Sequence, residues 1–182
     1  MKILKTKLKD CCIIEPKVFK DKRGYFFESF NNKQFKDLTE SETAFVQDNE
    51  SYSTKGVLRG LHYQTGVYAQ AKLVRVIKGK VLDIAVDLRE NSKTFGQYIS
   101  VELTEENKKQ LFIPKGFAHG FIVLSDTAIF SYKCDNNYNK ASEQGIIFND
   151  KELNIDWRLP EDQIIVSEKD TILPTFKNAI LP

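Results

Sequence analysis

Short runs of β-branched and aromatic residues, separated by turn residues, recur along most of this chain and constrain its fold more than any other feature. They predict strands over 18–19, 25–30, 43–46, 57–58, 72–77, 81–88, 98–103, 110–113, 120–124, 127–133 and 145–148. Few helical patterns lie between them. The sequence therefore predicts an all-β protein, either a sandwich, a jelly roll or a barrel.

Two reversals and two minor elements can also be placed. Gly79 lies between two β-branched runs, as does the Ser125-Asp126 pair, and each pattern predicts a β-hairpin. A short helix is expected over 32–38 and a capped turn over 104–107. No repeat or linker interrupts the sequence, and a chain of 182 residues can bury roughly 70% of its unfolded surface. We expect one domain spanning residues 1–182.

Composition excludes several classes of protein. No apolar run approaches the ~20 residues of a membrane helix, and the basic start lacks the apolar core of a signal peptide, so we expect a cytoplasmic protein that does not bind membranes. A net charge of +2 without blocks of like charge argues against nucleic-acid binding. Cys11, Cys12 and Cys134 cannot form a disulfide framework and are expected to be reduced core residues.

One predicted strand carries acidic groups on a single face. In the run 81–88 the even positions are all aliphatic, whereas the odd positions include Asp83 and Asp87. Because successive side chains of a strand point to opposite faces, both acids share the face opposite the aliphatic one. That face is expected to meet either solvent or a polar cavity.

The chain has only two histidines, and both lie in apolar segments. His62 follows Arg59 in the run 57–64, and His119 is flanked by glycine and phenylalanine in 111–121. Histidine titrates near neutral pH, so each is a candidate proton carrier; the alternative is a hydrogen-bonded core residue. Strand alternation places Arg59 and His62 on opposite faces unless a bulge, which Gly60 would permit, interrupts the strand.

The two histidines do not form a recognisable metal site. Neither has a neighbouring histidine partner, so a site with three or four ligands would need to recruit carboxylates or thiols. We therefore expect no bound metal.

Several of these segments resemble one known family. They are 19–28, 45–49, 57–64, 70–76, 86–89 with 94–96, 113–121, 132–133 and 148–150. They are similar, in the same order, to segments of the dTDP-4-dehydrorhamnose 3,5-epimerases, and the resemblance extends from near residue 1 to about residue 175. It implies a cupin-like jelly roll with a few short peripheral helices, in which the barrel encloses the ligand cavity without a metal or another cofactor.

The resemblance also implies a reaction. The family inverts C3 and C5 of dTDP-4-dehydro-6-deoxy-D-glucose through enolate intermediates and gives dTDP-4-dehydro-β-L-rhamnose. A carbonyl at C4 acidifies the protons at both carbons, so each inversion needs a base, a group beside the enolate oxygen and an acid on the opposite face. By resemblance these are His62, Lys72 and Tyr132.

Each of these assignments has an alternative. Lys72 alone would more simply be a solvated strand residue, and Tyr132 a core aromatic. Asp170 matches the carboxylate that pairs with the base in the family, as the aspartate does in a catalytic triad. Asp83 is the rival partner for His62, because its strand face could line the cavity.

Further residues match positions that contact the nucleotide sugar in the family. They are Arg23, Glu28, Gln47, Asn49, Arg59, His119, Tyr138, Glu143 and Lys169. Arginine suits a diphosphate because its planar guanidinium donates hydrogen bonds in pairs. Family members exchange the segment that holds Arg23 and Glu28 between subunits, so a homodimer is expected.

The chain departs from the family pattern near the expected sugar pocket. The segment 136–140 lacks the first aromatic residue and the proline that family members often have, and Phe148 stands where tryptophan is common. These differences leave open a C3-only epimerase of a related nucleotide-linked 4-keto-deoxysugar. A non-catalytic sugar-nucleotide-binding cupin and a metal-dependent oxygenase are the alternatives from other classes.

Overall fold

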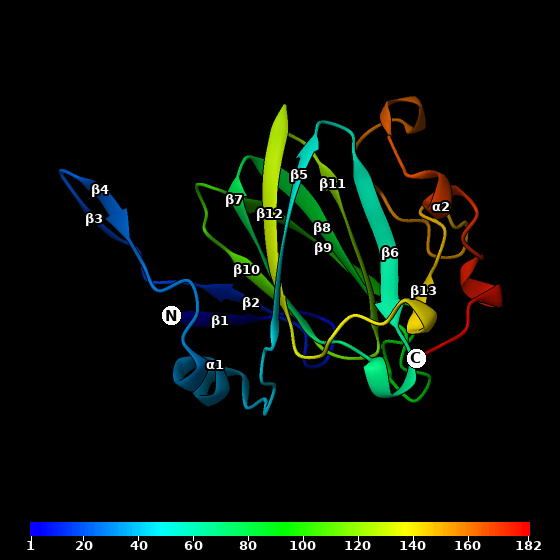
Figure 1. Ribbon diagram of the computed structural model, residues 1–182, viewed down its shortest axis with the longest axis horizontal. Coiled ribbons are helices and arrows are strands. Elements are labelled where there is room, and N and C mark those ends of the chain that lie inside the picture. Colours follow the sequence, from blue (N-terminus) through cyan, green and yellow to red (C-terminus); the bar gives the residue numbers. More distant parts are fainter.

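The computed structural model describes residues 1–182 and consists mainly of two antiparallel sheets that face each other (Figure 1). The first sheet contains, in spatial order, β1 (Lys2–Lys5), β2 (Cys12–Glu15), β10 (Gln110–Ile113), β7 (Lys72–Lys78), β12 (Thr127–Cys134) and β5 (Gln47–Thr54). The second contains β13 (Glu143–Gly145), β6 (Leu58–Gln64), β11 (Phe117–Val123), β8 (Lys80–Asp87) and β9 (Tyr98–Thr104). The all-β jelly roll expected from the sequence is confirmed.

The remaining elements are short and peripheral. They are the hairpin of β3 (Phe19–Asp21) and β4 (Gly24–Phe26), the helices α1 (Asn32–Thr39) and α2 (Glu168–Thr171), and the 3-10 turns η1 (Gly66–Tyr68), η2 (Lys140–Ser142), η3 (Glu161–Gln163) and η4 (Phe176–Asn178). Helix α1 confirms the predicted helix, and the side chain of Asn31 caps it by accepting from the backbone N–H of Gln34. The turn over 104–107 is confirmed too, since Thr104 Oγ1 accepts from the backbone N–H of Asn107.

Both predicted hairpins are wrong. The turn at Gly79 joins β7 of the six-stranded sheet to β8 of the five-stranded sheet, and the turn at Ser125-Asp126 likewise joins β11 to β12. Turn chemistry specifies a tight reversal but not which strands become hydrogen-bonded neighbours. Here β8 pairs with β9 and β11, so the chain crosses between the sheets at each of these turns.

Strand β5 lies where no strand was predicted. The sequence predicted a strand at 43–46, which is wrong, and missed Gln47–Thr54, which pairs with β12 along its whole length. The run is polar, so it lacks the β-branched signal that marks most strands. The N-terminal strands β1 and β2 were also missed, and the strand expected over 145–148 lies instead at Glu143–Gly145.

The core has one apolar layer between the sheets and one outside each sheet. Val74, Ala85 and Phe130 belong to the layer between the sheets. Outside the five-stranded sheet, the even positions of β8 pack against the C-terminal segment around Trp157. Outside the six-stranded sheet, Phe35 of α1 covers the strands. The three cysteines are buried and unpaired with one another, as expected.

The two aspartates on the acidic face of β8 lie in different environments. Asp83 is fully buried and lies between the sheets, where it is bonded to His119. Asp87, also fully buried, is enclosed by a loop, where it accepts hydrogen bonds from Arg89, Ser92 and Thr94. Burial would raise the pKa of Asp87, but these donors outweigh it and lower the pKa to about 2.

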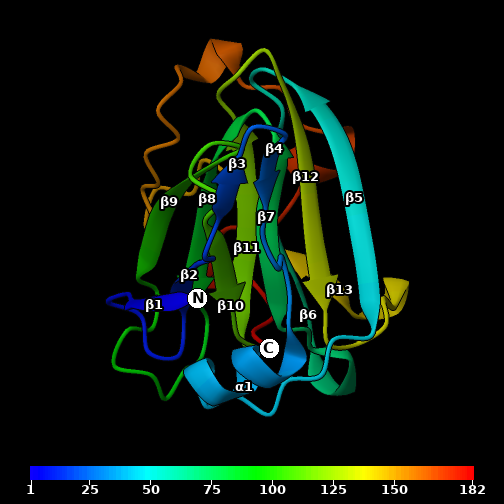
Figure 2. The ribbon, with the colours of Figure 1, turned by 90° about the vertical axis from the view of Figure 1, so that its left-hand side faces the viewer.

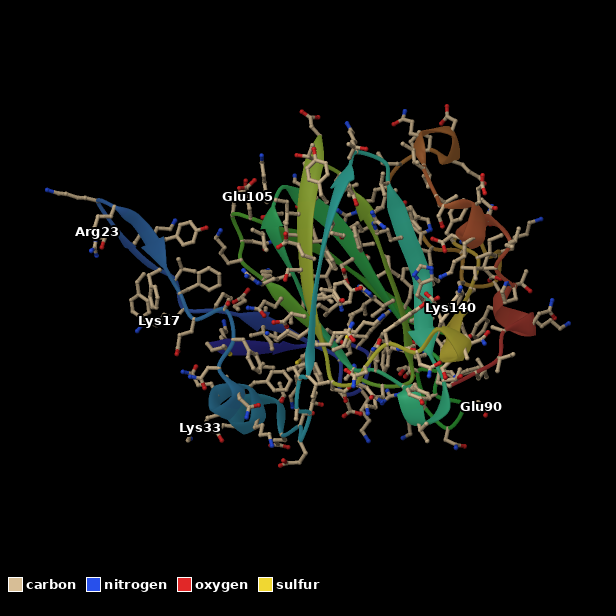
Figure 3. All side chains as sticks on the ribbon, viewed as in Figure 1. Lys17, Arg23, Lys33, Glu90, Glu105 and Lys140 are labelled. Atoms are coloured by element: carbon tan, nitrogen blue, oxygen red, sulfur yellow. The ribbon has the colours of Figure 1, made fainter.

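The β3–β4 hairpin projects from the body of the molecule (Figure 1), and in Figure 2 it points toward the viewer, in front of the sheets. Its aromatic residues Phe19, Tyr25 and Phe26 are exposed, and Arg23 lies near its tip (Figure 3). No helix of the structure has the length and apolar character needed to span a membrane.

Strands β6 and β11 approach each other closely at a glycine pair. Gly60 has a φ of +135°, its peptide bond to Leu61 is cis, and the β6–β11 register shifts between His119 and Phe121. A Cβ on Gly60 would lie 2.5 Å from the Cα of Gly120. This irregularity confirms the expected bulge, and it places Arg59 and His62 on the same inner wall.

We predict that Gly60→Ala destabilises the protein by about 2 kcal/mol or more, because alanine both adopts a disfavoured φ and clashes with backbone. Gly24→Ala is the matched control, since Gly24 has a φ of +129° but a Cβ added to it would meet no atom within 4 Å beyond its chain neighbours. Urea unfolding followed by circular dichroism measures both variants. Equal stability of the two would show that the β6–β11 contact does not require glycine.

Candidate active site

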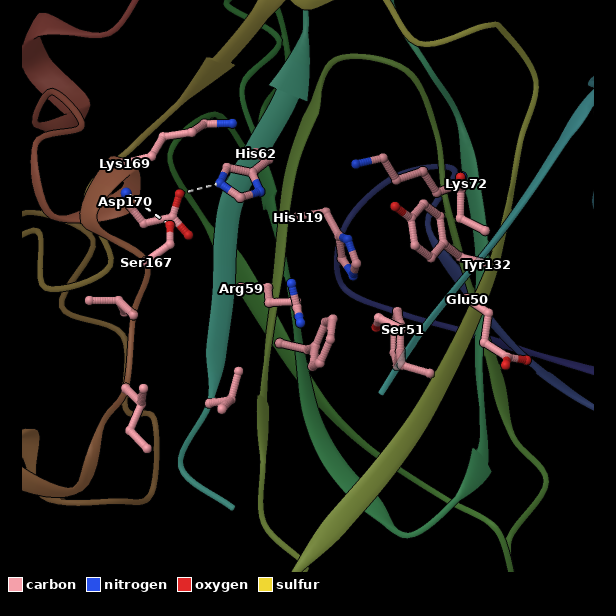
Figure 4. Close-up of a pocket in the computed structure, with 16 residues that line it drawn as sticks. Glu50, Ser51, Arg59, His62, Lys72, His119, Tyr132, Ser167, Lys169 and Asp170 are labelled. Carbon is pink, nitrogen blue, oxygen red and sulfur yellow. Dashed lines mark hydrogen bonds and ion pairs between the residues drawn. The ribbon is translucent and has the colours of Figure 1, made fainter. Parts of the chain in front are cut away.

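A cavity of about 630 Å³ opens between the two sheets and is lined from both sides (Figure 4). It receives His62 and Arg59 from β6, His119 from β11, and Lys72 and Tyr132 from the facing sheet. A smaller cavity of about 250 Å³, here called the annex, shares Asn49, His62, Lys72 and Tyr132 with it. The two cavities therefore meet at the residues predicted to carry the chemistry.

His62 is bonded to Asp170 across a sequence separation of 108 residues. Its Nε2 lies 2.7 Å from Asp170 Oδ1 on α2, whose N-terminus is capped by Ser167. Burial would raise the pKa of Asp170, but the hydrogen bonds that its carboxylate accepts, chiefly from His62, hold the pKa below its ordinary value. An ionised carboxylate here accepts the Nε2 proton and leaves Nδ1 of a neutral ring available to a ligand.

A second histidine–aspartate pair lies deeper between the sheets. His119 Nε2 lies 3.0 and 3.1 Å from the two oxygens of Asp83, and its ring stacks against Phe130 with the centroids 6.1 Å apart. Burial raises the pKa of Asp83, although the neighbouring His119 opposes this. The structure thus pairs Asp83 with His119 and Asp170 with His62, so Asp83 is excluded as the partner of His62.

Lys72 and Tyr132 face the two histidines from the six-stranded sheet, on the adjacent strands β7 and β12. Lys72 makes no salt bridge, and its burial lowers the pKa of the ammonium group, with partial opposition from the charges of Cys134 and Asp83. Burial raises the pKa of the Tyr132 phenol. Burial therefore keeps the Tyr132 phenol protonated at neutral pH, and at Lys72 it favours the neutral amine over the ammonium form.

Further polar side chains lie in the main cavity and at the annex. Arg59 Nε donates to Ser53 Oγ at 3.1 Å, which fixes the guanidinium within the main cavity. At the annex, Glu143 accepts from Tyr138 at 2.9 Å and forms an ion pair with Lys169 at 2.7 Å. Burial would raise the pKa of Glu143, but these two partners hold it below its ordinary value.

All the predicted site residues line one of the two cavities except Arg23 and Glu28. Arg23 is bonded to Asp21 on the projecting hairpin, with 90% of its side chain exposed. Glu28 accepts hydrogen bonds from Asn31 and Gln34 beside α1. Within one chain, neither residue reaches the cavity.

Sequence reasoning missed several residues that line the cavities. Phe121 and Phe130 stack with centroids 4.1 Å apart and form an apolar wall. Ser51 faces the main cavity from β5, and Gln64 faces the annex from the end of β6. The alternation of Gln47, Asn49, Ser51 and Ser53 was the available signal, but it becomes meaningful only once β5 is known to be a strand.

No group of three or more histidine, cysteine, aspartate or glutamate residues has the arrangement of a metal site. The metal-free and cofactor-free site expected from the sequence stays a prediction.

Comparison with known proteins places the chain in one group. The sequence profile of the family described as dTDP-4-dehydrorhamnose 3,5-epimerase matches residues 5–178. The chain is 55% identical over 170 residues to the dTDP-4-dehydrorhamnose 3,5-epimerase of Shigella flexneri, covering 93% of each chain. It is also similar to the crystal structure of that enzyme from Elizabethkingia anophelis, with a TM-score of 0.95, 61% identity and coverage of 98% of this chain and 97% of the other.

A third similar protein was crystallised with a ligand. It is the dTDP-6-deoxy-D-glucose-3,5-epimerase of Legionella pneumophila in complex with dTDP-4-keto-L-rhamnose, with a TM-score of 0.94, 50% identity and coverage of 97% of this chain and 93% of the other. These likenesses extend over nearly the whole chain and over both sheets that build the cavity. The chain belongs to the dTDP-4-dehydrorhamnose 3,5-epimerase family.

Proposed function

We propose that this protein is an isomerase that inverts C3 and C5 of dTDP-4-dehydro-6-deoxy-D-glucose to give dTDP-4-dehydro-β-L-rhamnose. One observation carries the proposal: His62 with Asp170 lies on one wall of the cavity, and Tyr132 lies on the facing wall. Inversion of a carbon centre removes a proton from one face and returns a proton to the other. Proton carriers on opposite walls meet that requirement.

The first step is removal of a proton next to the C4 carbonyl. His62 acts as the base through Nδ1, because Asp170 already accepts the Nε2 proton at 2.7 Å. As the ring becomes positively charged, the Asp170 carboxylate stabilises it and keeps it oriented. The electrons of the C–H bond move into a C–C double bond, and the carbonyl oxygen becomes an enolate oxygen.

Lys72 stabilises the enolate oxygen. Its amine group lines the cavity without a carboxylate partner, and although burial lowers its pKa, the negative charge that develops on the enolate favours the ammonium form. A cation fixed in a part-buried site favours the anionic intermediate more than it would in water, because little water screens it. Tyr132 then returns a proton to the carbon from the opposite side and becomes a phenolate. Exchange with solvent water removes the proton from His62 and restores that of Tyr132, after which a second round at the other carbon completes the reaction.

Arg59, with its guanidinium oriented by Ser53, is proposed to bind the diphosphate. The other predicted substrate-binding residues of the cavities, Gln47, Asn49, His119, Tyr138, Glu143 and Lys169, are proposed to contact the sugar or the nucleotide. The chemistry needs no electron transfer and hence no redox cofactor. We propose that the protein works in the cytoplasm as a single catalytic domain.

The working unit is proposed to be a homodimer. The β3–β4 hairpin stands away from its own cavity and exposes the aromatic residues Phe19, Tyr25 and Phe26. Exposed aromatic side chains on a projecting hairpin are typical of a surface that binds another protein. A two-fold dimer would bury this same surface on both chains. Arg23 would then reach the nucleotide in the partner's cavity.

The proposed reaction predicts loss of the C3 and C5 proton signals when the protein and its substrate are followed by proton NMR in deuterated buffer. Loss of one signal indicates a C3-only epimerase, and loss of neither indicates a non-catalytic binder. His62→Asn should lower the exchange rate by ~10²-fold or more, because it removes the base. Exchange at the wild-type rate in this variant would contradict the assignment of His62.

Replacing Tyr132 by phenylalanine should separate proton removal from inversion. His62 still forms the enolate, so we expect solvent exchange at C3 to persist while net inversion decreases by ~10²-fold. NMR measures exchange and product stereochemistry in the same sample. If exchange and inversion both disappear together, Tyr132 does more than return the proton.

The dimer proposal predicts complementation between Arg23→Ala and His62→Ala, each nearly inactive alone. In a mixed dimer, one cavity combines an intact His62 with an intact Arg23 from the other chain. Random exchange of subunits should restore about one quarter of the wild-type activity per chain. Lys22→Ala, which changes an adjacent exposed cation, is the control and should stay active. No recovery in a sample shown by native mass spectrometry to contain mixed dimers would reject a role for Arg23 across the interface.

A further inference from the structure

Only two buried side-chain polar atoms in the chain lack a hydrogen-bond partner, and both belong to residues that line the candidate site. They are Ser51 Oγ at the main cavity and Gln64 Nε2 at the annex. Gln64 is 5% exposed, so its amide cannot compensate by reaching bulk water. Buried polar groups are nearly always hydrogen-bonded, so each exception needs an explanation, such as a catalytic role or an ordered water.

The orientation of the Gln64 amide is fixed by the backbone. Its Oε1 accepts the N–H of Asn139 at 2.7 Å, and because that N–H is a donor only, the oxygen of the amide must face it. The NH₂ group therefore takes the other position and can only donate. Its missing partner must be an acceptor, such as a carbonyl, enolate, hydroxyl or phosphate oxygen.

The position of Gln64 on β6 narrows the choice of acceptor. Arg59, His62 and Gln64 follow one another along the inner face of β6, while Leu61 and Tyr63 point outward into the apolar layer beneath the C-terminal segment. Figure 4 shows Arg59 and His62 at successive positions along β6. Residues two apart on one face of a strand lie about 7 Å apart, so Gln64 stands beside His62 on the side away from Arg59.

This order orients a ligand. With the diphosphate at Arg59 and the reacting carbons at His62, Gln64 meets the part of the sugar farthest from the diphosphate. The diphosphate is attached at C1, and in a six-membered sugar ring C4 is the carbon opposite C1. The annex is bounded by Lys72 and Tyr132 as well, so it holds the reacting half of the ring.

We propose that Gln64 is a further catalytic residue, whose Nε2–H donates a hydrogen bond to the oxygen at C4 as that oxygen changes from carbonyl to enolate. This inference rests on the proposed epimerase function and adds a second donor beside Lys72. When His62 removes the C3 or C5 proton, the C–H electron pair forms the C–C double bond and the carbonyl electron pair moves to oxygen. Gln64 transfers no proton; it stabilises the negative charge, which is greatest at this oxygen.

The test compares Gln64→Met with Gln64→Glu. Methionine removes both the donor and the acceptor for Asn139, whereas an ionised glutamate keeps the acceptor and removes the donor. The comparison is made at about pH 9, because burial raises the pKa of a carboxyl group and a protonated glutamate could still donate. Gln70→Met is the matched control, since Gln70 also lines the annex but its Nε2 already donates to the Asn136 carbonyl at 2.8 Å.

We expect both Gln64 variants to lower kcat and the rate of C3 proton exchange by about 10²-fold relative to wild type at the same pH. Their affinity for dTDP, measured by calorimetry, should not change, because dTDP lacks the sugar. Gln70→Met should keep most of the activity. Circular dichroism confirms that each variant is folded.

Three results would overturn the inference. Activity regained in Gln64→Glu but not in Gln64→Met would mean that Gln64 only holds the Asn139 segment. A change confined to KM or to dTDP affinity would mean that Gln64 contacts the ground state or the nucleotide. Near wild-type kcat in both variants would mean that an ordered water, and not the substrate, satisfies Nε2. If the wild-type protein itself exchanges no substrate proton, the proposed function fails first, and the two failures are thereby distinguished.

Discussion

The close backbone contact between Gly60 on β6 and Gly120 on β11 is the constraint on which the candidate site depends. A Cβ on either glycine would meet the backbone of the other strand. The contact accompanies a shift in the β6–β11 register, and it changes which side chains of β6 face inward. Regular alternation would send Arg59 and His62 to opposite faces. With the irregularity, Arg59, His62 and Gln64 form one row along the cavity.

The chemistry of the site follows from how the two sheets share it. His62 and His119 belong to one sheet, and Lys72 and Tyr132 belong to the other. Each histidine is bonded through Nε2 to its own aspartate, so each is held in one orientation. The buried environment keeps the Tyr132 phenol protonated and lowers the pKa of Lys72, which has no carboxylate partner. A ligand between the sheets thus has a histidine on one side and a tyrosine on the other, as the proposed base and acid require.

The cavity also explains two features that would otherwise only lower the stability of the fold: a polar strand, and buried polar atoms without hydrogen-bond partners. The polar strand β5 contributes little to an apolar core, yet its inward side chains Asn49 and Ser51 line the cavity, and Ser53 orients Arg59. Unpartnered buried polar atoms are rare in folded proteins, and here Ser51 and Gln64 both face the cavities. The polar atoms of Ser51 and Gln64 that lack partners are understandable as parts of a ligand site.

The sequence by itself determined the all-β class and most of the strands, and nearly all of the site residues that it named through resemblance to a family line one of the two cavities. Periodicity and residue type suffice for these because they are local properties. Local signals failed at Gly79 and Ser125, where a tight turn was correct but the pairing partner was not, and at β5, whose polar residues carry no strand signal. Only the tertiary structure decided that Asp170 pairs with His62 and Asp83 with His119, because residues 108 and 36 positions apart meet only after the sheets have formed. It also decided the free donor of Gln64, since that depends on the backbone N–H of Asn139, on a segment whose position no local pattern specifies.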